Sequence, residues 1–240
     1  MHNVFMNSSN GLLSISDTSS GRPKLFIECS TIDVKTSLLV GEEVRKSGLG
    51  FFADAPVSGG PNGAYAATLT FMVGSTVDVF ERVKPIIQTM GKEGSIFYCG
   101  AASAGLATKQ INNYLSAICN IGTCEAMNMG IRYGLDPNVL AGVINVGSGK
   151  NYNSLDQNPV KGVNPTAAAA KDFEGGFSME LCKGVIDMAV ESGKEVGAKS
   201  VMSNVLEGVF EKAVRNEKTS GKDCRSVYRL FAEDDGRELD

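Results

Sequence analysis

Short apolar segments alternate with longer amphipathic segments over the first hundred residues of the chain. The short segments have the length and the apolar content of buried strands: 25–29, 50–54, 68–73 and 95–99. Apolar residues recur at helical spacing over 33–46 and 77–89, with Ser30 and Thr31 placed to cap the first helix and Pro85 placed to bend or divide the second. Strands that alternate with helices predict a largely parallel, doubly wound sheet.

The pattern becomes helical after Gly100. Residues 104–133 are small or apolar around most of the helix circumference, which predicts one long buried helix with Gly134 as its left-handed cap. A second helix is predicted from Pro137 to Val146, with Asp136 as its cap. The remaining predictions are helices at 179–192, 201–217 and 224–231, a polar functional loop at 147–166 and a charged tail at 233–240. We therefore expect an α/β domain at 1–102 and an all-helical domain at 103–240.

Composition narrows the class of function. The net charge of −4 offers no general attraction to nucleic acid, and no apolar run is long enough to predict a membrane span. His2 is the only histidine, so a Ser-His-Asp triad, a Cys-His pair or a histidine-based zinc site would have to use a residue at the end of the chain. The six cysteines include no CxxC pair, which predicts free thiols. Proton transfer must then use a lysine, a tyrosine, a cysteine or a carboxylate.

Two glycine-rich segments resemble the sequence motifs of phosphate-binding loops only superficially. Gly48-Leu49-Gly50-Phe51-Phe52-Ala53 fits Gly-x-Gly-x-x-Gly/Ala, but it leads from a predicted helix into a predicted strand, the reverse of the order that such a loop needs. Gly147-Ser148-Gly149-Lys150-Asn151 has Asn151 where a serine or threonine is required, and no predicted strand runs into it. We expect neither segment to bind a pyrophosphate.

The segment Asp54-Ala55-Pro56-Val57-Ser58-Gly59-Gly60 carries the clearest candidate chemistry. Its Ser-Gly-Gly turn follows a predicted strand and exposes backbone N–H groups suited to a carboxylate, although a tight turn without function has the same sequence. Lys109 lies in an uncharged stretch of the long helix, where burial lowers the pKa of an ammonium toward neutrality; the alternative is a lysine whose end reaches water at the helix margin. Asn113 lies four residues on, on the same helix face. A carboxylate cradle and a lysine together indicate a site for a small hydroxy acid.

The combined pattern resembles the β-hydroxyacid dehydrogenase family, particularly its members that act on 3-hydroxyisobutyrate. The resemblance covers nearly the whole chain. Its segments are Glu28-Cys29-Ser30-Thr31-Ile32, 54–60, Gly63-Ala64 with 68–74, 105–113, Glu125-Ala126, Gly134-Leu135-Asp136, Asn158-Pro159, and Gly175-Gly176-Phe177 with Leu181 and Lys183. This resemblance implies an α/β fold with a Rossmann-type doubly wound sheet, incomplete here, followed by an all-α domain through which such enzymes form homo-oligomers.

The resemblance also implies the reaction and the roles of residues. The reaction is the NAD-dependent oxidation of 3-hydroxyisobutyrate to methylmalonate semialdehyde in valine breakdown, with NADP as the alternative cofactor. The implied location is the mitochondrial matrix, or the cytoplasm if no targeting segment precedes Met1. The implied roles are carboxylate binding for Ser58, Gly59 and Gly60, proton handling for Lys109, substrate orientation for Asn113, and cofactor binding for Thr31, Phe177 and Lys183.

Two departures from the family pattern leave alternatives open. Lys183 is followed by Gly184 where the family has an aspartate, which puts the support of Lys183 in doubt. The family's glycine fingerprint would precede Met1, so we expect roughly two βα units, about 30 residues each, to be absent. The alternatives are a related small hydroxy acid or semialdehyde as the substrate, and a non-catalytic remnant that only binds partners or dimerises.

Overall fold

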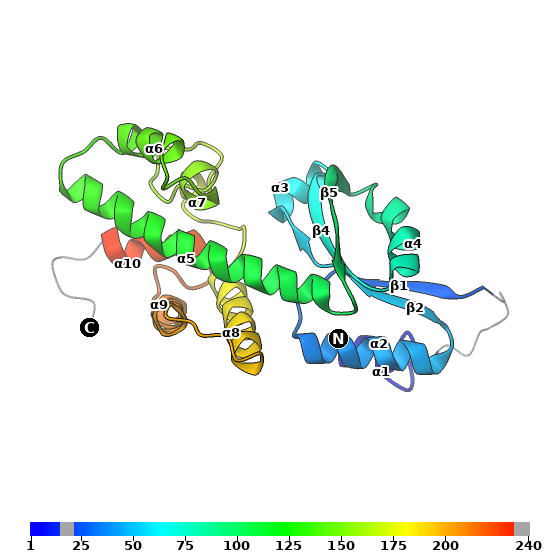
Figure 1. Ribbon diagram of the computed structural model, residues 1–240. Coiled ribbons are helices and arrows are strands. Elements are labelled where there is room, and N and C mark those ends of the chain that lie inside the picture. The colour runs from blue at the N-terminus through cyan, green and yellow to red at the C-terminus, as the bar shows by residue number, and fades with distance from the viewer. Residues whose placement is uncertain (15–21, 233–240) are drawn as a thin grey trace. The chain divides into compact units, whose positions relative to one another are not determined.

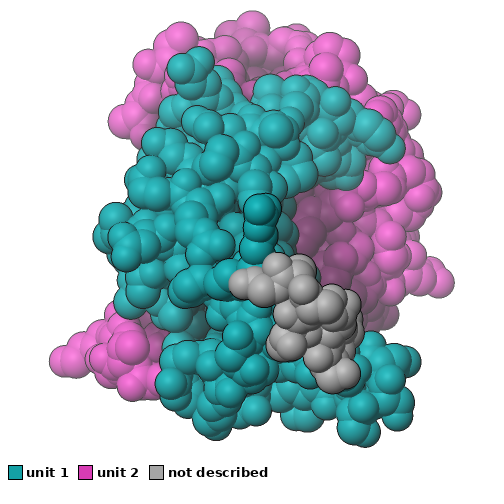
Figure 2. Space-filling model, turned by 90° about the vertical axis from the view of Figure 1, so that its right-hand side faces the viewer, with its two compact units in different colours: residues 1–111 teal, residues 112–240 magenta. Residues whose placement is uncertain are grey.

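A computed structural model describes residues 1–14 and 22–232. The chain forms two compact units, unit 1 (Met1–Ile111) and unit 2 (Asn112–Asp240), which Figure 2 colours separately. The tail expected at 233–240 lies outside the described residues. One long helix runs through the junction of the units, so the expected domain boundary after residue 102 stays a prediction.

Unit 1 is built on a mixed sheet, which has five strands within the described residues (Figure 1). They are β1 (Lys24–Glu28), β2 (Gly50–Asp54), β3 (Val57–Ser58), β4 (Leu69–Gly74) and β5 (Gly91–Gly100). The strand order is β1-β2-β4-β3, with β5 also paired to β4. β1 is parallel to β2 and β4 to β5, whereas β4 is antiparallel to β2 and β3.

The α/β fold is confirmed, but the expectation of a largely parallel sheet is wrong for β4. Parallel neighbours need a crossover connection, usually a helix that packs on the sheet. The link from β2 to β4 instead carries β3 and the short helix α3 (Gly60–Tyr65), which leaves no crossover helix between them. β4 therefore returns antiparallel to β2.

Helices cover both faces of this sheet, because successive side chains of a strand point to opposite faces. On one face, Ile27 and Ala53 pack with α4 (Val77–Ile87) through Val83. On the other face, Phe26 and Phe52 pack with α1 (His2–Met6) and α2 (Val34–Ser47) through Phe5, Val40 and Val44. Phe52 and Asp54 are two residues apart in β2, so Asp54 lies on the face that α2 covers.

Helix ends in unit 1 differ from two expectations. The cap of α2 is Asp33, whose carboxylate accepts from the Thr36 N–H at 2.8 Å, so the prediction of a cap at Ser30 and Thr31 is wrong. A side-chain acceptor must sit at the residue that immediately precedes the first turn, and only Asp33 does. α4 runs through Pro85 as one helix and ends at Ile87.

Unit 2 is helical within the described residues. Its elements, with α5 beginning in unit 1, are α5 (Ala104–Arg132), α6 (Pro137–Val146), α7 (Tyr152–Leu155), η1 (Ala168–Lys171), α8 (Met179–Glu195), α9 (Ser203–Arg215), η2 (Cys224–Tyr228) and α10 (Arg229–Ala232). Gly134 has φ of 88° after α5, and Asp136 accepts from the N–H groups of Asn138 and Val139, as expected. The polar loop predicted at 147–166 contains α7.

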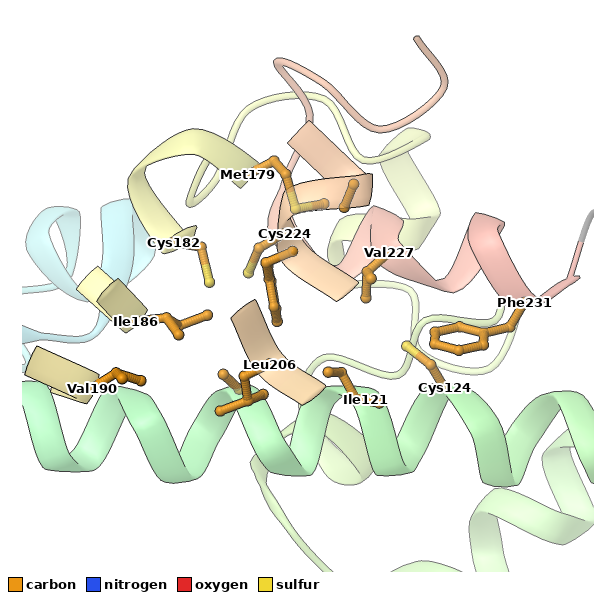
Figure 3. Packing of buried hydrophobic residues seen from close by; sticks show 13 residues of the cluster. Ile121, Cys124, Met179, Cys182, Ile186, Val190, Leu206, Cys224, Val227 and Phe231 are labelled. Atoms are coloured by element: carbon orange, nitrogen blue, oxygen red, sulfur yellow. The ribbon is translucent and has the colours of Figure 1, made fainter. Parts of the chain in front are cut away.

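The core of unit 2 is a single cluster in which side chains from α5, α8, α9, η2 and α10 meet (Figure 3). Leu206 and Phe210 of α9 are fully buried there, with Met179 and Ile186 of α8. All six cysteines are free thiols, as predicted. Among the described residues, none of the helices combines the length and the apolar character that a membrane crossing requires.

Candidate active site

The carboxylate of Asp54 holds the beginning of α5 against the end of β2. Asp54 is fully buried; its Oδ1 accepts from the N–H of Ser103 at 2.6 Å and its Oδ2 from the N–H of Leu106 at 2.9 Å. Ser103 immediately precedes α5 and Leu106 lies in its first turn, at the helix end where N–H groups have no intrahelical partner and the helix dipole favours a negative charge. Burial raises the pKa of Asp54 above its ordinary value, while the bonds from Leu106 and Ser103 oppose that rise.

Two glycines allow this close approach of helix and sheet. A Cβ on Gly105 would lie 2.2 Å from the carbonyl oxygen of Met72, and a Cβ on Gly74 would lie 2.4 Å from Asp54 Oδ1. Real Cβ atoms do not approach backbone oxygens so closely. Glycine is therefore required at both positions for α5 to begin where it does.

A second bond joins α5 to the loop after β1. The side chain of Gln110 is 1% exposed and donates from Nε2 to the carbonyl oxygen of Ile32 at 3.0 Å. Ile32 follows Thr31, and Gln110 follows Lys109. The segment that contains Thr31 therefore lies beside the part of α5 that carries Lys109.

Lys109 is buried in unit 1, with 9% of its surface exposed. Burial lowers the pKa of its ammonium from the ordinary 10.5 to about 8. About a tenth of such lysines are neutral at pH 7, against fewer than one in a thousand for an exposed lysine. The side chain can therefore accept or release a proton near neutral pH.

The 58–60 turn requires its glycines. Gly59 has φ of 137° and Gly60 has φ of 62°, backbone conformations that other residues rarely adopt. Ser58 is half-buried and pairs with Thr70 at the end of β3, whereas both glycines are exposed. The turn thus presents a bare, solvent-accessible backbone, as an anion cradle must.

Asp54 is connected to both Lys109 and this turn: to the turn through the chain, and to the helix of Lys109 through hydrogen bonds. Ser58 is four residues after Asp54, which limits their Cα separation to about 13 Å. Lys109 is three residues after Leu106, about 4.5 Å further along the helix and on the same side. Asn113 follows one turn later in α5. α5 is thus bonded to the end of the strand that leads into the turn; that Lys109, Asn113 and the turn form one site stays a prediction.

The end of β1 has the chemistry expected around a nicotinamide. Ligands of doubly wound sheets bind beyond the carboxyl ends of parallel strands, and Thr31 lies three residues after Glu28, the last residue of β1. Thr31 is half-buried, and its neighbour Ile32 is bonded to α5 as described above. The cofactor role of Thr31 stays a prediction.

The described residues do not include a pyrophosphate loop of the usual kind. Gly48 is the C-cap of α2 and Gly50 is the first residue of β2, so this glycine pair precedes a strand, as the sequence indicated. Gly147 follows α6, and Asn151 caps α7. Over residues 1–14 and 22–232, no Gly-x-Gly-x-x-Gly segment joins a strand to a following helix.

Phe177 and Lys183, the other two predicted cofactor residues, lie in unit 2. The Phe177 N–H donates to Asp223 Oδ2 at 3.0 Å, and its side chain packs on the unit 2 core. Lys183 forms ion pairs with Asp187 at 2.6 Å and Glu211 at 3.2 Å, and the hydrogen bond that it donates to Asp187 raises its pKa. Asp187, one helical turn on, thus supplies the support that Gly184 cannot. The cofactor roles of Phe177 and Lys183 stay predictions.

Three residues that organise these segments had no predicted role: Asp54, Gln110 and Asp223. Asp54 is a polar residue in an apolar stretch, which is a signal that the sequence offers for it, whereas Gln110 lies in the polar stretch 108–113 and carries no such signal. Asp223 accepts from the N–H of Phe177 and is paired with Arg225 at 3.3 Å; a Cβ on Gly176 would lie 2.2 Å from its Oδ2. Within the described residues, no group of histidine, cysteine and carboxylate side chains is arranged to hold a metal ion.

Family models match both units. Residues 103–231 match the model described as the NAD-binding domain of NADP-dependent 3-hydroxyisobutyrate dehydrogenase. Residues 4–100 match the model described as the NAD-binding domain of 6-phosphogluconate dehydrogenase.

Curated relatives are similar over most of the chain. Human mitochondrial 3-hydroxyisobutyrate dehydrogenase is 38% identical over 211 residues, which cover 88% of this chain and 62% of the human protein. The 3-hydroxyisobutyrate dehydrogenase of Pseudomonas aeruginosa is 37% identical over 213 residues, which cover 88% of this chain and 70% of the bacterial protein. The chain thus spans a little over three fifths of the length of the mammalian relatives.

Solved structures share the fold. The 3-hydroxyisobutyrate dehydrogenase of Mycobacterium tuberculosis, determined with L-serine, has a TM-score of 0.78 and 34% identity, with coverage of 87% of this chain and 70% of that one. A Salmonella typhimurium protein described as 3-hydroxyisobutyrate dehydrogenase has a TM-score of 0.77 at 18% identity, and covers 96% of this chain and 75% of its own; this likeness concerns the fold alone.

Proposed function

Because the chain belongs to the β-hydroxyacid dehydrogenase family, we propose that it acts in the NAD-dependent oxidation of 3-hydroxyisobutyrate to methylmalonate semialdehyde. The observation that carries the proposal is the burial of Lys109 on a helix fixed to the strand that leads into the 58–60 turn. A lysine with a pKa of about 8 is poised for proton transfer at neutral pH.

In this proposal the 58–60 turn holds the substrate carboxylate. The N–H groups of Ser58, Gly59 and Gly60 and the Ser58 hydroxyl are donors suited to a carboxylate. A carboxylate held there directs the remainder of a small acid toward the neighbouring α5. Asn113, one turn from Lys109, supplies an amide that orients the substrate hydroxyl.

Lys109 handles the proton of the substrate hydroxyl. Its neutral amine accepts that proton during oxidation, and its ammonium stabilises the negative oxygen during reduction. The apolar surroundings of Lys109 strengthen both effects, because they lower the local dielectric constant. NAD⁺, when bound, supplies the acceptor for the hydride that leaves the hydroxyl-bearing carbon. Thr31, Phe177 and Lys183 are the residues proposed to hold the cofactor, with NADP as the alternative.

The choice of 3-hydroxyisobutyrate rests on the named relatives. It is a carboxylate with a hydroxyl on the β-carbon, and L-serine, present in the Mycobacterium tuberculosis structure, has the same arrangement. Other small β-hydroxy acids and semialdehydes offer the same two groups to the turn and to Lys109. They are the second choice of substrate within the same reaction class.

The proposal extends to valine breakdown, to a mitochondrial location and to a homo-oligomer formed through the helical unit. The location rests on the mitochondrial relatives of animals and plants; the bacterial relative supports the cytoplasmic alternative. Cell fractionation decides between the two locations. Light scattering at several protein concentrations measures the oligomeric state, and a monomer throughout would contradict this part of the proposal.

Substrate preference is tested by comparing kcat/KM for 3-hydroxyisobutyrate, L-serine and tartronate semialdehyde, the last in the direction of reduction. We expect 3-hydroxyisobutyrate to be preferred by at least tenfold. Equal values for all three would contradict the choice of substrate while supporting the reaction class.

Cofactor binding is tested by calorimetry with NAD⁺ and NADP⁺. We expect stoichiometric binding of NAD⁺, weakened by the substitution Thr31→Ala. If neither dinucleotide binds, a dehydrogenase activity of this chain is contradicted, and binding or dimerisation without catalysis becomes the better account.

A further inference from the structure

We propose that Asp54 is a positioning residue for Lys109: its carboxylate fixes the first turn of α5, and thereby the lysine, relative to the 58–60 turn. This inference rests on the proposed function, because it assigns Asp54 to the same active site. Asp54 does not touch the substrate in this account; it acts through Ser103, Leu106 and the helix that follows them.

Both carboxylate oxygens of Asp54 are used. The bonds from Ser103 N–H at 2.6 Å and Leu106 N–H at 2.9 Å attach the residue that precedes α5 and a residue of its first turn, and two such points restrict the helix in rotation as well as in position. Hydrogen bonds to an ionised acceptor are about twice as strong as those between neutral groups. An asparagine would present one oxygen and one NH₂ group, so one of the two N–H donors would face another donor.

The surroundings of Asp54 leave the helix no other place to begin. The spaces that Cβ atoms of Gly74 and Gly105 would occupy are filled by Asp54 oxygens and by the backbone of β4. Any shift of α5 toward β4 is blocked by the Met72 carbonyl, and any shift away lengthens the bonds to Asp54. The bond from Gln110 to the Ile32 carbonyl adds a second point of attachment, one residue beyond Lys109.

Attachment of the beginning of α5 also fixes the position of Lys109, because a helix is rigid over one turn. Lys109 follows Leu106 by three residues, so a displacement of the first turn is passed on to its Cα almost unchanged. A misplacement of about 1 Å at a catalytic group reduces the rate by up to about a hundredfold. A displacement would also admit water around the ammonium, which is buried in the native structure.

Burial of the Asp54 carboxylate is unfavourable for folding, and the positioning role of Asp54 explains why a carboxylate stands there. Asp54 is paired in register with Glu28 on the adjacent parallel strand, and both side chains are buried. A second buried carboxylate next to Glu28 is unfavourable for the fold. The two N–H groups at the beginning of α5 compensate for this cost at Asp54.

The proposal is tested with the substitution Asp54→Asn and two readouts. The first is the separate measurement of kcat and KM for 3-hydroxyisobutyrate oxidation. The second is an NMR titration of the Lys109 Cε resonance in the absence of ligands, which is assigned with Lys109→Arg. We expect kcat to fall at least tenfold, KM to change less than threefold, and the Lys109 titration midpoint to rise by about one pH unit or more.

The direction in which the Lys109 titration midpoint shifts distinguishes a displaced Lys109 from the mere loss of a nearby negative charge. Removal of a nearby negative charge, with no movement, lowers the pKa of an ammonium. Entry of water around a displaced Lys109 raises it. A midpoint that is unchanged or lowered in Asp54→Asn therefore overturns the proposal.

Gly105→Ala provides the same test with the Asp54 carboxylate intact, and it decides the matter if Asp54→Asn does not fold. Its Cβ would push the start of α5 away from β4, so the same loss of kcat and the same rise of the midpoint are expected. The matched control is Gly122→Ala in the same helix, where an added Cβ meets nothing within 4 Å. We expect Gly122→Ala to keep the wild-type kcat and the wild-type titration midpoint of Lys109.

Failure of the proposed function and failure of the positioning role give different results. A wild-type protein that oxidises no β-hydroxy acid contradicts the proposed function, while the NMR titration still tests the position of Lys109. An active wild-type protein whose Asp54→Asn and Gly105→Ala variants keep the wild-type kcat and midpoint overturns the positioning role alone.

Discussion

Oδ2 of Asp54, at the end of β2, accepts a hydrogen bond at 2.9 Å from the N–H of Leu106, in the first turn of α5. These residues are 52 positions apart in the chain. Their bond joins the strand that leads into the 58–60 turn to the helix that carries Lys109. Both the 58–60 turn and Lys109 belong to unit 1.

Substitution of Lys109 by methionine is expected to abolish activity and to stabilise the protein. Loss of the proton acceptor reduces kcat by about 10²–10⁴-fold. Removal of a buried charge with a pKa of about 8 in the folded state and 10.5 as its ordinary value raises the free energy of unfolding at pH 7 by up to about 3 kcal/mol. Kinetics and urea unfolding measure the two effects, with the exposed Lys92→Met as control. A variant with lower stability and residual activity near that of the wild type would refute this role.

The pH dependence of catalysis follows from the same lysine. Oxidation needs the neutral amine, so kcat/KM for oxidation is expected to rise with pH and to level off above about 8, the pKa of Lys109. The folded-state pKa is lower than that of the unfolded chain, so the unfolded state binds more protons between pH 8 and 10.5 and stability rises with pH across that window. The pH profile of kcat/KM tests the expected rise in rate, and unfolding curves at several pH values test the expected rise in stability. A kcat/KM profile that is flat from pH 6 to 9 would argue against Lys109 as the proton acceptor.

A comparison of two glycines in the same backbone conformation distinguishes an effect on substrate binding from an effect on stability. Gly60 has φ of 62° and Gly48 has φ of 66°, and an added Cβ would meet nothing within 4 Å at either position. Alanine at each is expected to destabilise the fold by about 1–2 kcal/mol through backbone strain. Only Gly60→Ala is expected to raise KM for the substrate, by about tenfold, because it disturbs the 58–60 turn. Equal KM values for the two variants would exclude the turn as the carboxylate cradle.

The buried ion pair of unit 2 is expected to matter for stability. Asp223 bonds to Arg225 and to the Phe177 N–H, and both charged side chains are largely buried. Asp223→Ala leaves the Arg225 guanidinium unpaired and is expected to cost about 3–5 kcal/mol. The double variant Asp223→Ala with Arg225→Met is expected to recover part of that loss, because no buried charge remains. Urea unfolding of Asp223→Ala, of Arg225→Met and of the double variant measures this; additive losses would contradict the coupling of the pair.

Features that depend on local sequence were predicted well. β1, β2, α5 and α6 lie within one or two residues of the predicted ranges, because apolar periodicity and caps such as Asp136 act over a few residues. The position of Lys109 in an uncharged stretch also indicated its burial correctly.

Features that depend on distant contacts were not predictable. The antiparallel course of β4 depends on the absence of a crossover helix, and a short strand and helix at 57–65 carry no distinct periodicity. The bond between Asp54 and Leu106, and that between Gln110 and Ile32, each join residues more than 50 positions apart. Glu211 of α9 as a partner of Lys183 depends on the packing of α8 against α9.

The central claim is that Lys109 transfers the proton in the oxidation of a β-hydroxy acid. The most direct measurement is the rate of NADH formation from 3-hydroxyisobutyrate by the wild-type protein, by Lys109→Met and by the control Lys92→Met. The account predicts activity in the wild type and in the control, and a loss of at least a hundredfold in Lys109→Met with a fold at least as stable. Equal rates in all three proteins, or a wild-type protein that binds NAD⁺ but oxidises no β-hydroxy acid, would contradict it.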